Sequence, residues 1–214
     1  MTIRNRYTGQ PSASKAALRL KFSCDLVFGL VLLVLAAPVV ACAALTVWLE
    51  DFSNPFFGQW RAGWQGKRFR LWKLRTMAPD VPPPSALGQV ASDCEHVTRV
   101  GRVLRRLKLD ELPQLINVVK GDMSLVGPRP TLPAQADAYG HREAIRLLVR
   151  PGMTGWAQIN GNTKLTWSDR IALDRWYVNN WSLALDIQIL VRTIRVVVDG
   201  EQIVASAVEE ARRC

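Results

Sequence analysis

The sequence has 214 residues, an apolar fraction of 49% and a formal net charge of +10. This length supports one sizeable hydrophobic core, so we expect a single globular unit with a short appendage. The positive charge favours anionic partners: nucleic acid, phosphorylated substrates or an acidic membrane face. With four cysteines, no CxxC pair and only two histidines, the sequence shows neither a disulfide framework nor a Cys/His metal site. Cys24 and Cys42 lie in apolar sequence and are expected to be small buried residues.

The N-terminal quarter contains one long apolar segment. Residues 1–21 hold five basic residues and no acid, and residues 26–49 then contain no charged residue. As a straight helix this run would be roughly 36 Å long, enough to cross a bilayer. Pro38 lies at its middle, removes a backbone donor and disfavours helical geometry at Ala37. Three interpretations are open: a kinked span, a re-entrant helix that enters and leaves by one face, and a cleaved signal peptide.

The flanks of the segment favour re-entrance. Basic residues precede it, and those that follow it are Arg61, Lys67, Arg68, Arg70 and Lys73. A spanning helix is expected to have one basic flank, on the cytoplasmic side, so two basic flanks suggest that both ends are cytoplasmic. Residues 39–42 (VVAC) resemble a lipoprotein cleavage box, but the apolar run is longer than a signal peptide's hydrophobic region and continues past the box.

After residue 50 the sequence predicts one mostly helical α+β unit. Alternating apolar and basic residues predict a strand over 69–74, and four prolines with a glycine predict a mobile loop over 79–93. Apolar positions at helical spacing predict an amphipathic basic helix over 99–108. A further helix is expected to begin at Asp110, run to about Lys120 and stop at Gly121. Other helices are expected over 142–149, 167–177 and 183–198.

The strongest chemical signal is the pair Asp110 and Glu111. An Asp-Glu pair alone is most often a solvated helix start. Here, however, Asp110 is expected at a helix N-terminus, where free N–H groups favour a carboxylate anion and also offer a site for phosphate. Such a carboxylate is available as a nucleophile.

Cations are expected to converge on this pair. Arg105 lies one turn before Asp110, and the cationic pair Lys73 and Arg75 lies at the end of the predicted strand. Two prolines hold Arg129 in a rigid turn that suits a bidentate contact with phosphate. The residues expected to bind the phosphorylated substrate are Lys73, Arg75, Arg105, Pro128, Arg129 and Pro130.

Four motifs in this order resemble the bacterial sugar transferases, small monotopic phosphoglycosyl transferases that begin cell-surface glycan assembly. They are the apolar segment with Lys21, Asp25 and Pro38; KLRTM over 73–77; LDELPQLINVVKGDMSLVGPRP over 109–130; and RPGMTGWAQINGNTKLTW over 150–167, followed by Leu173-Asp174 and YVNN over 177–180. The resemblance covers about residues 19–198. The chain departs from the family pattern at Ala37, where a serine often precedes the proline, and at Lys108, where many relatives have serine.

The resemblance implies an activity and a cofactor. Asp110 would attack the β-phosphate of a UDP-sugar, release UMP and pass the phosphosugar to polyprenyl (undecaprenyl) phosphate, with Glu111 as the second catalytic residue. Mg²⁺ is the expected cofactor and Asp110 its expected ligand, because a cation offsets the repulsion between a carboxylate and two phosphoryl groups. The implied partners are the UDP-sugar, polyprenyl phosphate and the lipid bilayer, without nucleic acid; a homo-oligomer is left open.

The resemblance also implies an organisation. We expect an α+β, mostly helical fold in which a re-entrant membrane helix, broken at Pro38, carries a membrane-interface catalytic domain. The expected divisions are a basic tail over 1–21, the membrane helix over 22–49 and the catalytic domain over 50–214, on the cytoplasmic face of the bacterial inner membrane. Two alternatives are a membrane-anchored binding protein for an acidic polymer or nucleic acid, and an extracytoplasmic protein lipidated at Cys42.

Overall fold

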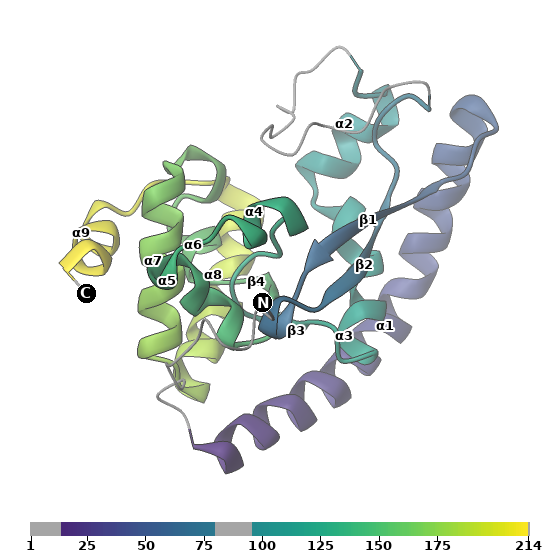
Figure 1. The fold of residues 1–214 in the computed structure, drawn as a ribbon. Helices are drawn as coiled ribbons and strands as arrows, with labels where there is room; N and C mark the ends of the chain where they lie inside the picture. The colour runs from purple at the N-terminus through teal and green to yellow at the C-terminus, as the bar shows by residue number, and fades with distance from the viewer. Residues whose placement is uncertain (1–13, 80–95, 214) are drawn as a thin grey trace.

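The computed structural model describes residues 14–79 and 96–213. Apart from Pro79, the loop expected over 79–93 lies outside these residues. Figure 1 shows a long N-terminal helix that runs along one side of a mixed, mostly helical body. In chain order the elements are α1 (Lys15–Asp51), β1 (Phe56–Ala62), the 3₁₀ turn η2 (Trp64–Gly66), β2 (Arg68–Leu74), α2 (Arg99–Arg106), η3 (Leu109–Gln114), α3 (Leu115–Val119), β3 (Ser124–Val126), α4 (Pro133–Asp137), α5 (His141–Ala144), η4 (Ile145–Leu148), β4 (Gly152–Thr154), α6 (Trp156–Ile159), η5 (Asn162–Lys164), α7 (Trp167–Asn179), α8 (Leu183–Asp199) and α9 (Ala205–Arg213).

Helix α1 is continuous, which corrects the expected break at Pro38. It begins after Ser14, whose side chain accepts a hydrogen bond from the backbone N–H of Ala17, so the last part of the expected tail is already helical. Pro38 lies inside the helix, and Figure 1 shows α1 bent along its length rather than interrupted. A proline in a helix removes one backbone hydrogen bond, and a bend accommodates that loss. The helix ends at Asp51, and the next residue, Phe52, adopts the left-handed conformation.

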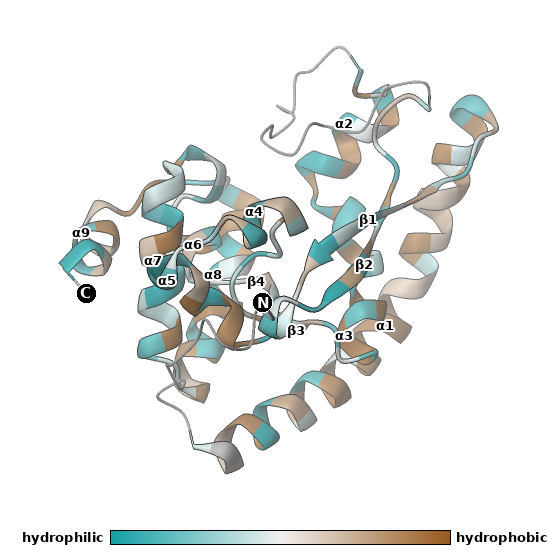
Figure 2. Cartoon of the chain, in the orientation of Figure 1, coloured by the Kyte–Doolittle hydropathy of each residue, from teal (hydrophilic) through white to brown (hydrophobic). Residues whose placement is uncertain are grey.

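One face of α1 contacts the body along most of its length. The residues on this face are spaced three or four apart, as a helix requires. They are Lys21, Asp25, Gly29, Leu33, Ala36, Val40, Ala43 and Val47. The opposite face exposes large apolar side chains, and Figure 2 shows hydrophobic colours along the middle of α1. By length and composition this helix could cross a membrane, and only 11% of its most apolar window is buried.

Polar contacts fix both ends of α1 to the same body. Near the N-terminal end, the buried Lys21 donates to Asp186 at 2.6 Å, and Asp25 accepts from the hydroxyl of Ser124 at 2.7 Å. At the other end, both Nη atoms of Arg75 donate to Asp51. The Lys21–Asp186 pair is buried, and removal of one partner from a buried ion pair strongly destabilises a protein, so this pair helps to fix the orientation of α1.

Two small sheets support the loops of the site. Strands β1 and β2 form an antiparallel hairpin with Phe56 opposite Leu74, which confirms the strand expected over 69–74 and adds an unexpected partner. Strands β3 and β4 pair in parallel with Ser124 opposite Gly152. At the end of β3, a Cβ on Gly127 would lie 2.5 Å from the carbonyl of Arg150, so only glycine allows this close approach.

The remaining helices pack around one main core. Met123, Leu173, Val178 and Ile189 are among its fully buried side chains. Helices α2, α7 and α8 confirm three of the expected helices, the one expected over 142–149 divides into α5 and η4, and α9 was not expected. The fold is therefore α+β and mostly helical, as expected. Cys42 is exposed on α1, so its expected burial is wrong.

Candidate active site

The Asp-Glu pair lies in a 3₁₀ turn, which corrects the expected helix cap. Lys108 takes the N-cap position in the left-handed conformation (φ 56°), and its side chain makes no capping hydrogen bond. Asp110 and Glu111 therefore belong to the first turn of η3, and α3 starts only after Pro113. A left-handed lysine costs of order 1 kcal/mol or more, and such strain is often found at functional sites. The expected stop at Gly121 is confirmed, since this residue has φ 80°.

Two cations hold Glu111. Lys73 at the end of β2 donates to its Oε1 at 2.7 Å, and Arg129 donates from Nη2 to the same oxygen at 2.7 Å. The Glu111 side chain is 17% exposed. Burial opposes its ionisation, but Arg129 and Lys73 outweigh that effect and hold the pKa of Glu111 well below its usual range. Glu111 is thus a fixed anion that positions two cations from different parts of the chain.

Asp110 is the less engaged carboxylate. Its nearest cation is Lys73, whose Nζ lies 3.8 Å from Oδ2. No hydrogen bond to the Asp110 carboxylate is formed within residues 14–79 and 96–213, although its side chain is only 11% exposed. Burial raises the pKa of Asp110, Lys73 opposes that rise, and the charge of Glu111 adds to it. This corrects the expectation that a helix terminus favours the Asp110 anion.

The coupling between the two carboxyls is testable by titration. We expect ¹³C-carboxyl NMR to show a pKa for Asp110 above that of an ordinary aspartate and a pKa for Glu111 below that of an ordinary glutamate. In Glu111→Gln the pKa of Asp110 should fall, because the neighbouring negative charge is removed and Lys73 and Arg129 are released. The signal that disappears in the spectrum of Asp110→Asn identifies the resonance of the Asp110 carboxyl. An Asp110 pKa unchanged in Glu111→Gln would contradict the coupling.

Arg129 is positioned through its backbone by a buried network. Arg146 donates from Nη2 to the carbonyl of Arg129 at 2.9 Å and forms an ion pair with Asp174 at 2.6 Å. It also donates to the hydroxyl of Tyr139 at 2.8 Å. Burial raises the pKa of Asp174 to about 6 although Arg146 opposes that rise. The rigid turn expected from the flanking prolines therefore has a second support, which comes from η4 and α7.

The other expected binding residues have different places. Arg105 on α2 contributes positive charge near Asp110 and donates from Nε to the hydroxyl of Thr76 at 2.9 Å. The carbonyl of Pro130 accepts a hydrogen bond from Arg61 at 3.4 Å, and the carbonyl of Pro128 accepts one from Gly152 at 2.9 Å. Arg75 does not join the residues around Asp110 and Glu111, because it forms an ion pair with Asp51 at the end of α1. Its side chain is only 11% exposed.

Sequence reasoning missed two charged residues beside the site. Arg61 on β1 lies near Arg129 and Glu111, and burial together with repulsion by Arg129 lowers its pKa to about 10. Glu201 follows α8 and accepts hydrogen bonds from Asn162 at 2.6 Å and from Lys108 at 3.1 Å. Glu201 thereby links the segment after α8 to the left-handed residue before η3. No local spacing signals either residue, because long-range packing brings them to the site.

The charges of the site match a phosphorylated ligand. Lys73, Arg61, Arg105 and Arg129 surround the two carboxylates, so the site has a surplus of positive charge. The described residues contain no cluster of three or more acidic, histidine or cysteine side chains that could hold a metal. Mg²⁺ usually keeps several waters and takes one or two carboxylates together with substrate phosphates. Asp110, which has no competing hydrogen bond from the described residues, fits that pattern.

Comparison with known proteins gives a consistent result. The family model described as bacterial sugar transferase matches residues 16–200. A Bacillus subtilis protein described as the uncharacterized sugar transferase EpsL is 44% identical, over 86% of this chain and 90% of the relative. Proteins described as UDP-glucose:undecaprenyl-phosphate glucose-1-phosphate transferase are 43% identical in Caulobacter vibrioides (79% of this chain, 66% of the relative) and 40% identical in Escherichia coli (82% and 39%). The chain thus spans most of the Bacillus protein and about two-fifths of the Escherichia coli protein.

Proposed function

The chain belongs to the bacterial sugar transferase family, and we propose that it transfers a sugar 1-phosphate from a UDP-sugar to undecaprenyl phosphate through a covalent phosphosugar on Asp110. The observation that carries this proposal is the division of roles in the Asp-Glu pair. Glu111 is bound by two cations, whereas the buried Asp110 accepts no hydrogen bond from the described residues. The functions named for the Caulobacter and Escherichia coli relatives supply the substrate class.

The proposed reaction has two displacements at one phosphorus. First, an Oδ atom of Asp110 attacks the β-phosphorus of the UDP-sugar, and the bond from that phosphorus to the bridging oxygen breaks. The electron pair leaves with UMP, and an acyl phosphate that carries the sugar remains on Asp110. Second, a phosphate oxygen of undecaprenyl phosphate attacks the same phosphorus, which releases the Asp110 carboxylate and gives undecaprenyl diphosphate sugar. A covalent intermediate of this kind divides one transfer into two easier steps.

The neighbouring residues supply electrostatic support. Arg129 and Lys73 share Glu111, so both cations are already oriented before a diphosphate enters. Preorganised cations of this kind stabilise charge that develops in a phosphoryl-transfer transition state. Mg²⁺, held by Asp110 and the substrate diphosphate, would supply further neutralisation of the phosphoryl oxygens. The raised pKa of Asp110 makes it a more basic nucleophile than an ordinary aspartate once it is deprotonated.

We also propose that α1 is re-entrant and that the catalytic domain lies on the cytoplasmic face of the inner membrane. Both ends of α1 form ion pairs with one body, at Lys21 and at Asp51. Residues between them also contact that body, so a straight crossing would draw charged parts of the domain into the hydrocarbon. The exposed apolar face of α1 is left to contact lipid. Basic flanks on both sides of the segment agree with this arrangement.

Cysteine labelling in intact cells tests the topology. In a variant without native cysteines, Ala16→Cys and Ser206→Cys should both be shielded from an impermeant maleimide added outside, and both should react after the inner membrane is opened. Both positions are exposed in the protein, so shielding cannot come from burial. Labelling of Ala16→Cys alone from the periplasm would indicate a spanning helix. A permeant maleimide provides the reactivity control for each variant.

The decisive experiment for the intermediate omits the lipid acceptor. The enzyme is given UDP-sugar and Mg²⁺, and its intact mass and UMP release are measured. We expect a burst of about one UMP per active site and a phosphosugar adduct that maps to Asp110. Added undecaprenyl phosphate should remove the adduct. A preparation that is active with lipid but gives neither burst nor adduct would instead indicate direct transfer in a ternary complex.

A further inference from the structure

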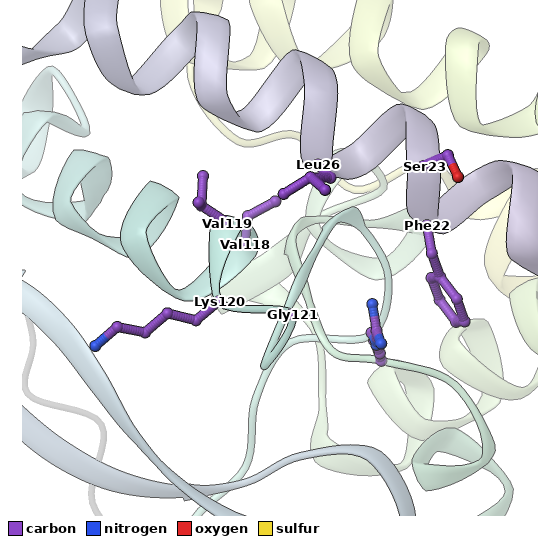
Figure 3. Close-up of a pocket in the computed structure, with 8 residues that line it drawn as sticks. Phe22, Ser23, Leu26, Val118, Val119, Lys120 and Gly121 are labelled. Carbon is purple, nitrogen blue, oxygen red and sulfur yellow. The ribbon is translucent and has the colours of Figure 1, made fainter.

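A pocket separate from Asp110 lies between α1 and the end of α3, with a volume of about 270 Å³. Its lining comes from three segments distant in sequence: one on α1 and one at residues 118–121, both labelled in Figure 3, and Arg150. Its apolar wall consists of Phe22, Leu26, Val118 and Val119. None of the residues that surround Asp110 lines this pocket, so a ligand here and a sugar nucleotide at Asp110 would contact different side chains.

The most informative residue of the pocket is Arg150. Its guanidinium stacks 3.8 Å from the centroid of the Phe22 ring, and its Nε atom is buried. Within residues 14–79 and 96–213, Arg150 donates no hydrogen bond and forms no ion pair. The buried Nε–H therefore has no acceptor among the described residues, which is unfavourable, although the carboxylates of Asp25 and Asp122 act on Arg150 through their charge. An anion in the pocket would accept a hydrogen bond from this group and pair with the guanidinium charge.

Lys120 is a second cationic residue of the lining. Lys120 forms no ion pair within the part of the chain that the structure describes, and its flexible stem allows the ammonium to swing toward the pocket. In Figure 3 this side chain extends away from Phe22, in keeping with a cation that has no fixed partner among the described residues. Ser23 is a third polar residue of the lining. The lining therefore combines an apolar wall with two cationic residues and one serine.

The position of the pocket along α1 points to a lipid. Asp25 is the last charged residue before the uncharged run 26–49, and the pocket contacts the helix at Phe22, Ser23 and Leu26. It thus lies where α1 passes from its charged start to its apolar part. In a bilayer this transition corresponds to the headgroup region, where lipid phosphates lie above the acyl chains. The exposed side chains of Leu26 and Leu30 continue the apolar surface beyond the pocket.

We propose that this pocket binds the phosphate headgroup of an anionic glycerophospholipid of the phosphatidylglycerol type. Arg150 and Lys120 contact the phosphate, and the acyl chains run from the wall of Phe22 and Leu26 along the exposed face of α1. Such a lipid would fix the depth at which α1 and α3 lie in the membrane. The proposal requires that α1 lies in a bilayer, but it does not depend on transfer through Asp110.

Lipid retention measures this binding without any assay of transfer. The full-length protein is placed in nanodiscs of equal parts phosphatidylglycerol and phosphatidylcholine, and native mass spectrometry identifies the lipids retained after release. The wild type should retain phosphatidylglycerol in preference to phosphatidylcholine. The double variant Arg150→Gln/Lys120→Gln should lose about tenfold or more of that preference, because two charge-assisted contacts are removed. The double variant Arg142→Gln/Lys67→Gln, at two exposed cations outside the pocket, should keep it.

A second variant guards against misfolding. Lys120→Glu leaves the stack of Arg150 on Phe22 intact and should also reduce retention, with thermal unfolding in phosphatidylcholine discs unchanged. Retention of phosphatidylglycerol at the wild-type level by the Arg150→Gln/Lys120→Gln variant would overturn the proposal. So would preferential retention of added undecaprenyl phosphate together with a higher KM for it in Arg150→Gln, because that result would make the pocket the acceptor site.

Discussion

Replacement of Asp110 by asparagine should abolish transfer and leave the protein folded. Asparagine keeps the shape of the side chain but cannot form the acyl phosphate, so we expect turnover to fall by at least about a thousandfold. Lys73 and Arg129 keep their contact with Glu111, and the cation cluster therefore remains paired. UMP release in the presence of lipid measures the loss. Turnover above roughly a tenth of the wild type would rule out Asp110 as the nucleophile.

The same variant should be as stable as the wild type or more stable near neutral pH. Burial raises the pKa of Asp110, so its ionisation opposes folding. That unfavourable contribution is complete above the raised native pKa and disappears as the pH falls toward the value of an unfolded aspartate, about 4. The gain in Tm for Asp110→Asn should therefore shrink on acidification. Asp137→Asn is the matched control, because its carboxylate is about half exposed and pairs with Arg68 on the surface.

A carboxylate that costs stability at its own site is typical of a functional residue. Glu111 behaves in the opposite way: its pKa is depressed, so it contributes stability above its unfolded pKa, and this stability is lost as the pH falls through the native value. The two neighbours therefore differ in the sign of their pH dependence. The two residues are adjacent in the sequence, and both side chains are carboxylates. The hydrogen bonds that Lys73 and Arg129 donate to Glu111, and not to Asp110, separate their roles.

Local pattern predicted much of the fold. Alternation of apolar and basic residues located β2, and helical periodicity located α2 and α8. The pairing of β1 with β2 was missed because the sequence FFGQWRA has no strict alternation, and six of its seven residues are exposed or part-exposed. The cap expected at Asp110 was wrong because Lys108 adopts the left-handed conformation there, which a lysine rarely does.

For the site, the sequence identified residues that lie together in one contiguous motif, but it did not identify residues that come from distant parts of the chain. Asp110, Glu111 and Arg129 were found because they lie in one stretch of 22 residues over 109–130. Arg75 directly follows the motif lysine and leucine, yet it points to Asp51, since the end of α1 lies beside it. Glu201 was missed because it reaches Lys108 only when the segment after α8 packs on η5. Contacts of this kind depend on tertiary packing, and no pattern in the local sequence signals them.

Replacement of Arg129 by lysine should greatly reduce activity although it preserves the charge. The backbone of Arg129 is fixed by Arg146, and its planar fork already uses one nitrogen on Glu111, which leaves its other N–H groups for a phosphate. Lysine has a single ammonium and cannot contact a carboxylate and a phosphate in this fork geometry. We expect kcat to fall by about 10²-fold or more, as for the loss of one preorganised donor.

The conservative change Arg129→Lys separates catalysis from folding. The introduced ammonium would still neutralise Glu111 together with Lys73, so the Tm should change little, and the acyl-phosphate adduct should form slowly rather than disappear. Single-turnover UMP release with saturating UDP-sugar measures the first displacement directly. Arg142→Lys on the exposed surface of α5 is the control and should behave as the wild type. A first displacement as fast as in the wild type would mean that Arg129 acts only as a point charge toward Glu111 and that another cation holds the phosphate.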